Sequence, residues 1–208
     1  MTNPWQSIDL SDYEQHMRLD SVMQLQTMNA MMRTQFADHP NGTLMILGIA
    51  GGNGLEHIAP GNYERVIGVD VNADYLEATA RRYPQLADTL TCIHADLTHG
   101  DEVKRLPHAD TVVANLLIEY IGYDCFTHVI DHVAPTHVSC IIQINLEDGW
   151  VSDSPYLHAF DDLEQVHHLM EEPALAQAMA TIGYQTTARA EQPLPNGKKL
   201  VQLDFARA

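Results

Sequence analysis

Cysteine is scarce in this chain. The 208 residues include three cysteines, Cys92, Cys125 and Cys140, and no C-x-x-C pair. An odd number of widely spaced cysteines does not build a disulfide framework, and a cysteine zinc site needs thiolates at closer spacing. The sequence therefore predicts three reduced thiols and neither of these structural devices.

Long hydrophobic runs are also missing. No segment approaches the roughly 20 apolar residues that a helix needs to cross a bilayer. The opening residues MTNPWQSIDL do not place a basic region before an apolar one, as a secretory signal would. These absences disfavour a membrane partner, and we expect a cytoplasmic location.

Basic residues are few as well. Lys and Arg together number 11 against 28 Asp and Glu, which gives a formal net charge of −17 at pH 7. A field of this sign repels the phosphate backbone of nucleic acids. The adjacent basic pairs are Arg81-Arg82, Lys104-Arg105 and Lys198-Lys199. The charge therefore disfavours a nucleic-acid substrate and is typical of a strongly solvated surface.

The length and hydrophobic content of the chain predict one α/β domain at residues 41–208, with residues 1–40 as a helical cap packed on it. Hydrophobic residues make up 45% of the chain, enough to bury a sheet between two layers of helices. Strand-like runs alternate with helical patterns, which predicts a doubly wound, mostly parallel sheet with right-handed crossovers. The strands of this alternating part are expected at Leu44–Ile49, Arg65–Val69, Leu90–His94, Thr111–Asn115 and Val138–Ile144.

The C-terminal part predicts a different arrangement. Tyr184–Ala190 and Lys199–Phe205 are expected to be two strands joined by a Pro-Asn-Gly turn, so the seven-stranded sheet ends in an antiparallel hairpin. Helices are expected before this hairpin, at Phe126–Val133, Asp161–Met170 and Pro173–Ile182.

Two helices are expected in the N-terminal cap. Ser11 with Glu14 and Ser21 with Gln24 fit the capping box, in which a hydroxyl and a side chain three residues later satisfy each other's amides. The second helix carries an apolar face, interpreted as core packing, made by Val22, Leu25, Met28, Met32 and Phe36. The functional alternative is a lid over the glycine-rich turn, made by Tyr13, His16 and Met17.

The glycine-rich turn follows the first strand, in the stretch TLMILGIAGGNGLE at residues 43–56. The absent side chains of Gly52 and Gly54 are expected to let backbone N–H groups approach a ligand, with a helix N-terminus facing the same place. The dinucleotide pattern G-x-G-x-x-G fails because His57 stands at its last glycine position. The phosphate-loop pattern G-x-x-x-x-G-K-[ST] also fails, because no Lys follows the glycines. An ordinary strand-to-helix connection remains an alternative.

Polar side chains end the neighbouring strands. Asp70 follows the second strand, Asp96 the third, and Asn115 ends the fourth. Because the carboxyl ends of parallel strands meet at one edge of a sheet, these side chains are expected to lie together with Gly52. Asp70 is well placed to accept hydrogen bonds from ribose hydroxyls, the alternative being an exposed turn carboxylate.

With these residues in order, the chain from about Thr43 to its end resembles the class I S-adenosylmethionine-dependent methyltransferases. Ile46–Gly54 resembles the family's first motif, Asp70 matches the acid that holds the ribose, and Asp96-Leu97 resembles the pair that recognises adenine. Asp110–Leu117 resembles the fourth strand at the methyl-transfer end, and the final hairpin matches the family's antiparallel strand.

The resemblance implies S-adenosylmethionine as the cofactor. It implies a cofactor site made by Gly48, Ala50, Gly51, Gly52, Gly54, Asp70, Val71, Asp96, Leu97 and Asn115. Two residues depart from the family's pattern: Gly48 stands where an acid is usual, and Ala50 where the first glycine is usual. These departures support an alternative, a non-catalytic scaffold or sensor that binds the cofactor or its demethylated product.

The reaction implied is an in-line methyl transfer to a small molecule, with a protein as the alternative acceptor. Such a reaction mainly requires that the acceptor be held near the methyl group and that water be excluded. The candidate catalytic residues are Asn115, Glu119 and Tyr120; Tyr123 and His16 are further candidates for a general base, and Trp150 and Tyr156 for an aromatic wall of the acceptor site.

Histidines raise the alternative of a metal enzyme. His128 and His132 have a spacing that can chelate, and Cys92, His94 and Asp96 would share one face of a strand. Neither set has a third ligand at a motif spacing, so we predict no metal site. A nicotinamide-dependent dehydrogenase is the remaining enzymatic alternative for a nucleotide-type turn.

Overall fold

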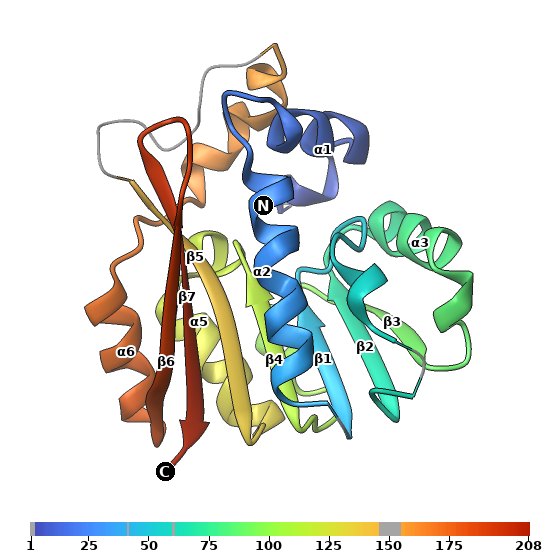
Figure 1. Cartoon of the computed structure of the whole chain (residues 1–208), viewed down its shortest axis with the longest axis vertical. Coiled ribbons are helices and arrows are strands. Elements are labelled where there is room, and N and C mark those ends of the chain that lie inside the picture. The colour runs from blue at the N-terminus through green and yellow to red at the C-terminus, as the bar shows by residue number, and fades with distance from the viewer. Residues whose placement is uncertain (1–2, 41, 60, 146–154) are drawn as a thin grey trace.

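The computed structural model describes residues 3–40, 42–59, 61–145 and 155–208. They contain a seven-stranded sheet with the order β3-β2-β1-β4-β5-β7-β6 (Figure 1). β1 to β5 pair in parallel, and β7 lies antiparallel between β5 and β6. The predicted fold class is confirmed. The strands are β1 (Thr43–Leu47), β2 (Arg65–Asp70), β3 (Leu90–His94), β4 (Thr111–Asn115), β5 (His137–Asn145), β6 (Tyr184–Pro193) and β7 (Lys198–Arg207).

Helices cover both faces of this sheet and one of its ends. The α-helices are α1 (Leu10–Arg18), α2 (Gln24–Asp38), α3 (Ala73–Arg82), α4 (Gly100–Val103), α5 (Ile118–Val133) and α6 (Glu172–Thr181). The 3-10 helices are η1 (Pro4–Gln6), η2 (Leu55–His57), η3 (Pro84–Leu86) and η4 (Leu157–Gln165). α2 and α3 pack on one face, whereas α4, α5 and α6 pack on the other.

Strand alternation explains this three-layer packing. In β1, Met45 and Leu47 face the layer of α5 and α6, while Leu44 and Ile46 face α2, and all four are buried. Successive side chains of a strand point to opposite faces, so a continuous apolar run such as that of β1 requires a helical layer on each side. The apolar face predicted for the second helix is likewise buried.

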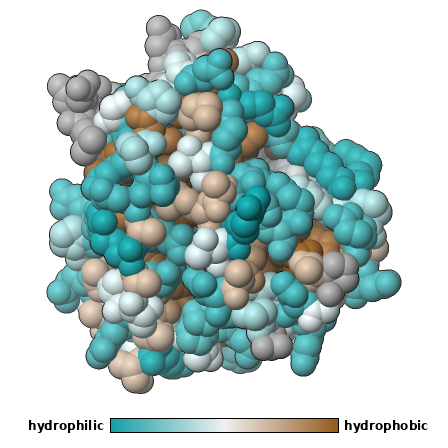
Figure 2. All heavy atoms as spheres, viewed as in Figure 1, coloured by the Kyte–Doolittle hydropathy of each residue, from teal (hydrophilic) through white to brown (hydrophobic). Residues whose placement is uncertain are grey.

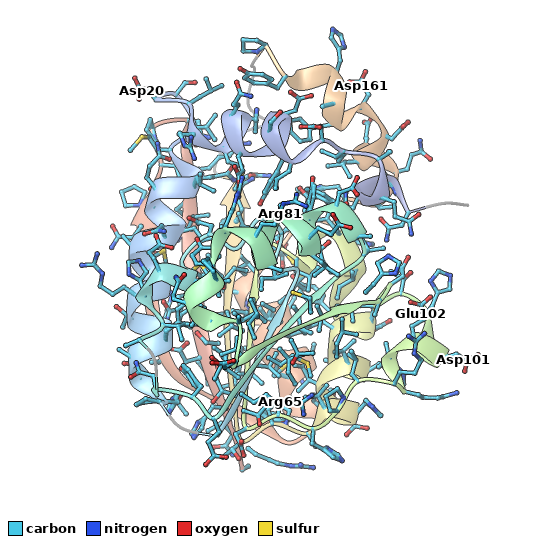
Figure 3. The ribbon with its side chains drawn as sticks, turned by 90° about the vertical axis from the view of Figure 1, so that its right-hand side faces the viewer. Asp20, Arg65, Arg81, Asp101, Glu102 and Asp161 are labelled. Carbon is cyan, nitrogen blue, oxygen red and sulfur yellow. The ribbon has the colours of Figure 1, made fainter. Side chains whose placement is uncertain are left out.

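The carboxyl end of the sheet is where η1, α1 and η4 gather (Figures 1 and 3). Arg65 at the start of β2 and Asp161 in η4 lie at opposite ends of the molecule (Figure 3). Ile8, Phe160 and Leu163 form a small apolar cluster that joins these N-terminal and late segments. The strand ends are therefore covered by residues from distant parts of the sequence.

The helix starts predicted for the N-terminal cap are wrong. α1 is capped by Asp9, whose Oδ1 accepts a hydrogen bond from Ser11 N at 2.7 Å, so Ser11 lies inside the helix. α2 begins at Gln24 after Met23, which has a left-handed backbone and no capping side chain. A carboxylate two residues earlier outcompetes the Ser11 hydroxyl because it also interacts favourably with the helix dipole.

The helix predicted at Asp161–Met170 is also wrong in type and extent. The segment forms the 3-10 helix η4, which ends at Gln165. Phe160 and Leu163 are buried in it, and their three-residue spacing puts them one 3-10 turn apart on the same face. The helix expected to begin at Phe126 instead begins at Ile118, with a kink at Gly122.

The surface agrees with the composition. The face in Figure 2 is covered mainly by hydrophilic residues, as a chain with a formal net charge of −17 requires. Across the described ranges, every helix is too short or too polar to span a bilayer.

Candidate functional site

A cavity of about 370 Å³ lies at the carboxyl ends of β1, β2 and β4. The sequence-predicted residues Gly48, Ala50, Asp70, Val71 and Asp96 line it. Leu97, Asn115 and Tyr120 also line it. The remaining walls come from Asn3, Pro4, Trp5, Tyr13, Val69, Tyr75, Ala95, Thr98, His99, Leu116, Leu117, Ile121, Gln165 and Val166. The topology thus brings most of the predicted cofactor residues around one space.

Asp70 is fixed by the backbone on the cavity wall and is 8% exposed. Its Oδ2 accepts a hydrogen bond from Ala50 N at 2.8 Å, and its Oδ1 accepts one from Asn72 N at 2.9 Å. Burial raises the pKa of this carboxyl, and the two N–H groups oppose that rise. Each carboxylate oxygen accepts more than one hydrogen bond, so Asp70 can also receive hydroxyl groups from a ligand.

Asp96 is the second carboxylate of the cavity and is 7% exposed. Thr98 donates to its Oδ1 from backbone N at 2.9 Å and from Oγ1 at 2.7 Å, and Asn3 Nδ2 donates to its Oδ2 at 3.1 Å. Burial raises the pKa of Asp96, but the hydrogen bonds from Thr98 and Asn3 outweigh this and hold it below its usual value. An amide N–H₂ therefore already occupies one oxygen of this carboxylate.

Aromatic rings cover the cavity. Trp5 meets Tyr13 and Tyr120 edge to face, with ring centroids 5.6 and 4.8 Å apart. Tyr13 stacks on Tyr75 at 6.3 Å. The Tyr75 side chain is 2% exposed, and its hydroxyl has no hydrogen-bond partner among the described residues. A buried hydroxyl without a partner is costly, so the cavity offers an unsatisfied polar group to a ligand.

The glycines Gly51, Gly52 and Gly54 do not line this cavity. A Cβ added at Gly52 would lie 2.7 Å from Tyr83, and one at Gly54 would lie 2.8 Å from Met32. The space left by the missing side chains of Gly52 and Gly54 is thus occupied by Tyr83 and Met32. Contact of the three glycines with a cofactor stays a prediction.

Backbone conformation explains the departure at Gly48 and shows the cost of the departure at Ala50. Gly48 has a φ of 67°, and a Cβ there would lie 3.2 Å from the Leu117 side chain, so an acid at this position would be strained. Ala50 has a φ of 47°, in the left-handed region that glycine occupies without strain. The turn therefore keeps its glycine-like shape at Ala50 at a cost of about 1–2 kcal/mol.

Asn115 is held by other protein groups. It exchanges amide hydrogen bonds with Gln35, at 3.0 and 2.9 Å, and its Oδ1 also accepts one from Ile141 N at 3.1 Å. These contacts join the end of β4 to α2 and β5. Its action on an acceptor or cofactor stays a prediction.

A second, smaller cavity of about 60 Å³ adjoins the first. The two share Trp5, Tyr13, Leu116 and Tyr120. The other residues of the second cavity are His16, Met17, Gln24, Glu119, Gln143, Phe160, Leu163, His167 and Lys198. Its wall therefore carries several ionisable side chains, among them His16, Glu119, His167 and Lys198.

Glu119 is the carboxylate of this second cavity and is 4% exposed. Its Oε1 accepts a hydrogen bond from Gln143 N at 2.7 Å, whereas its Oε2 is buried and has no partner within the described part of the chain. Burial raises the pKa of Glu119 to about 7. Burial also raises the pKa of the neighbouring Tyr120 hydroxyl, with the Glu119 charge adding to the effect.

The other candidates for acceptor chemistry are scattered. His16 lines the second cavity, and burial together with the charge of Lys198 lowers its pKa. Tyr123 lines neither cavity. Its hydroxyl donates a hydrogen bond to Glu171 O at 3.2 Å and accepts one from Glu171 N at 2.8 Å. Tyr156 donates to Gln15 Oε1 at 2.7 Å and lines neither cavity. Trp150 lies outside the described residues.

The candidate metal ligands make other contacts. His94 Nε2 lies 2.8 Å from Val71 O, and His132 Nε2 lies 3.0 Å from Leu106 O. Residues 3–40, 42–59, 61–145 and 155–208 hold no group of three or more His, Cys, Asp or Glu placed to bind a metal ion.

Sequence reasoning missed several cavity residues near the N-terminus, after η4 and at the start of β7. Asn3, Pro4 and Trp5 line the large cavity, and His167 and Lys198 line the small one. A signal for the first three was present: Asn3 caps η1 and Pro4 occupies its first position, a common way to begin a helix. The other two carry no local pattern, because only the tertiary fold brings them together.

Solved structures share this arrangement over most of the chain. The magnesium protoporphyrin IX methyltransferase of Synechocystis PCC 6803, determined with bound S-adenosylmethionine, matches with a TM-score of 0.62 and 12% identity, over 93% of this chain and 83% of that chain. The geranyl diphosphate C-methyltransferase of Streptomyces coelicolor A3(2), in complex with S-adenosyl-L-homocysteine, matches with a TM-score of 0.65 and 13% identity, over 90% of this chain and 84% of that chain.

The chain has the fold of the S-adenosylmethionine-dependent methyltransferases. YcgJ protein from Bacillus subtilis has the same fold, with a TM-score of 0.61 and 11% identity, over 88% of this chain and 99% of that chain. No protein-family model matches the chain, and no curated protein matches it significantly. At these identities the likeness concerns the fold.

Proposed function

We propose that this chain is an S-adenosylmethionine-dependent methyltransferase that acts on a small-molecule acceptor. The observation that carries the proposal is the cavity of about 370 Å³ at the carboxyl ends of β1, β2 and β4, with Asp70 and Asp96 on its wall. Its volume is in the range of roughly 300–1,000 Å³ that is usual for small-molecule sites. Its place, beyond the ends of parallel strands, is where ligands bind in open α/β sheets.

The residues of the cavity fit the cofactor. Asp70 has lone pairs left for ribose hydroxyls, and the Tyr75 hydroxyl is an unsatisfied group in the same space. Val71 and Leu97 provide apolar walls at the ends of β2 and β3, on which an adenine ring can pack. Asp96 accepts an amide N–H₂ from Asn3, so it is already arranged to accept the similar exocyclic amine of adenine.

The cofactor supplies a methyl group on a positively charged sulfur. The chain supplies position and exclusion of water, which are the main requirements of such a transfer. Trp5, Tyr13 and Tyr120 present aromatic rings in the large cavity, and ring faces attract cations. Tyr120 is shared by the two cavities and Glu119 lines the second one, so they are the residues to which we assign contact with the acceptor.

The charge and two of the similar structures support a small-molecule acceptor. Magnesium protoporphyrin IX and geranyl diphosphate, named for two of the similar structures, are both small molecules. A formal net charge of −17 opposes binding of a polyphosphate chain.

A second candidate is a non-catalytic protein that only binds the cofactor or its demethylated product. The strained Ala50 and the missing acid at Gly48 favour it, because both lie in the turn beside the cavity. Methyl-labelled S-adenosylmethionine incubated with a cell extract separates the two: a methyltransferase transfers label, and a scaffold binds the cofactor without transferring it.

Calorimetric titration with S-adenosylhomocysteine tests the cofactor site. We expect heat of binding for the wild type and none for Asp70→Ala, which removes a carboxylate on the cavity wall. Asp74→Ala is the matched control, since Asp74 is an exposed carboxylate in the first turn of α3. Absence of binding by the wild type would refute both the methyltransferase and the scaffold, and binding of NADH instead would favour a dehydrogenase.

A further inference from the structure

The second cavity has features that binding of the cofactor does not explain. Glu119 lines it, and Oε2 of this residue is buried and lacks a hydrogen-bond partner within the described residues. Because it shares Trp5, Tyr13, Leu116 and Tyr120 with the large cavity, anything bound in it lies against the occupant of that cavity. This is the position an acceptor needs.

Resting on the proposed function, we propose that the second cavity receives the reacting end of a small molecule whose methylated atom is a nitrogen or oxygen that carries hydrogen, an amine or a hydroxyl group. Glu119 Oε2 accepts the hydrogen bond from that group and then its proton. The proposal goes beyond the cofactor site, because it names the acceptor chemistry and the chamber that selects it.

The size of the chamber limits the acceptor. One buried water occupies roughly 10–15 Å³ of cavity volume, so the cavity of about 60 Å³ has room for about four to six water-sized groups. Its walls come from α1, α2, α5, β5, η4 and β7, which enclose it on several sides. A few atoms of a small molecule fit this space, whereas a folded protein surface or a nucleic-acid strand does not.

The chemistry of Glu119 selects the reacting atom. An ionised carboxylate only accepts hydrogen bonds, and its Oε1 is already satisfied by Gln143 N at 2.7 Å. The buried Oε2 therefore requires a donor, and leaving it unpaired costs about 1–3 kcal/mol or more for a charged group. Amines and hydroxyls are strong donors, whereas a carbon or a thioether sulfur provides no such hydrogen.

The methyl transfer conserves both electrons and protons. The lone pair of the acceptor atom forms the new C–N or C–O bond, while the C–S bonding pair stays on the sulfur. The acceptor's N–H or O–H proton passes to Oε2 of Glu119, which becomes a neutral carboxylic acid and later releases the proton to water. A group with a pKa near the working pH suits both halves of this exchange, and burial raises the pKa of Glu119 to about 7.

Other titratable groups face the same chamber. Burial lowers the pKa of His16 on α1 and that of His167 after η4, the latter to about 4, and in each case nearby positive charge adds to the effect. The imidazole of His167 is then neutral when Glu119 ionises. Burial lowers the pKa of Lys198 on β7 to about 8, and burial raises those of Tyr13 and Tyr120. The transfer rate is thus expected to rise as pH passes through about 7, where the base becomes ionised.

Ethanolamine, which carries both an amine and a hydroxyl, is the probe for a direct test without turnover. The full chain, saturated with S-adenosylhomocysteine, is labelled with ¹³C at the glutamate carboxyl carbons, and the Glu119 signal is the one missing in Glu119→Gln. We expect ethanolamine to shift this signal and to lower the pKa of Glu119 by about one unit, because a donor stabilises the ionised carboxylate. Ethylamine and ethanol, added separately, then distinguish an amine from a hydroxyl.

Transfer of labelled methyl to a cell extract supplies the second readout. We expect the label in small molecules as N-methyl or O-methyl groups, and a loss of about 100-fold or more in Glu119→Gln, with S-adenosylhomocysteine binding unchanged. Glu77→Gln, at an exposed site on α3, is the control.

The possible failures are distinguishable. No binding of S-adenosylhomocysteine by the wild type would refute the proposed function itself. If the wild type binds S-adenosylhomocysteine, three results would overturn the inference and leave the proposed function standing. They are a Glu119 signal that does not move, label found on protein, nucleic acid, carbon or sulfur, and full activity in Glu119→Gln.

Discussion

Replacing Glu119 by Gln is expected to stabilise the folded protein at alkaline pH. The carboxyl is buried, and its pKa rises from an ordinary 4.5 to about 7 on folding. A difference of this size corresponds to about 3 kcal/mol of unfolding free energy. Below the unfolded value both states are protonated and the carboxyl costs nothing extra. Between 4.5 and 7 only the unfolded state releases the proton, so stability falls as pH rises, and above 7 the full cost remains.

Urea unfolding of the wild type and Glu119→Gln, followed by circular dichroism between pH 5 and 8.5, measures this cost. Gln retains an oxygen that can accept from Gln143 N and carries no charge at any pH, so it resembles the protonated carboxyl. We expect the advantage of Glu119→Gln to grow from about 0.8 kcal/mol near pH 5 to about 3 kcal/mol at pH 8. A difference that does not change with pH would refute the claim that the buried carboxyl is held in an unfavourable ionised state. Glu77→Gln, at an exposed site, should show no such growth.

Three further substitutions probe the larger cavity and its turn. Asn3→Ala frees one oxygen of Asp96, so S-adenosylhomocysteine titrated by calorimetry should bind about 2–10-fold more tightly, and weaker binding would show that Asn3 helps to hold the ligand. Gly54→Ala should lower the unfolding free energy by about 1–3 kcal/mol more than Gly61→Ala, because both have positive φ but only Gly54 faces a methionine of α2; equal losses would contradict the packing argument. Ala50→Gly should raise the unfolding free energy by up to about 1 kcal/mol in urea melts, because it relieves a left-handed alanine, and a loss would argue against strain there.

Local patterns in the sequence were enough to predict the sheet. Buried parallel strands are continuous apolar runs, so β1, β2, β3 and β4 could be placed almost to the residue, and the ends at Asp70, Asp96 and Asn115 followed from the shared edge of such strands. The final hairpin was placed by its turn residues and proved longer, because the ladder continues from Pro193 to Lys199. These features depend on neighbours in the sequence.

The candidate site depended on distant contacts and was only partly predicted. Asn115 was expected at the site, but its pairing with Gln35 joins residues 80 positions apart, and no periodicity encodes it. Glu119 was a candidate base because it follows β4, yet its unpaired oxygen becomes evident only once β5 lies beside it. The backbone of Trp5 is held beside the cavity by Asn72, whose side-chain amide donates a hydrogen bond to Trp5 O at 2.9 Å.

The glycine-rich turn shows that a position can require glycine for more than one reason. Gly52 and Gly54 have positive φ, and an added Cβ would meet Tyr83 just after α3 at the first position and Met32 of α2 at the second. A sequence pattern records that a side chain is excluded and does not record which group excludes it.

The order of the strands also has a consequence for biosynthesis. β7 follows β6 in the chain but lies between β5 and β6, and its first residue, Lys198, forms a wall of the smaller cavity. While a ribosome is still making residues 198–207, the emerging polypeptide can assemble the parallel strands, but β6 has no docking partner and the chamber beside Glu119 stays open. A released polypeptide that is truncated before Lys198 should therefore resist protease over the parallel strands and be cleaved within β6. The chamber beside Glu119 thus closes only after β7 has been synthesised.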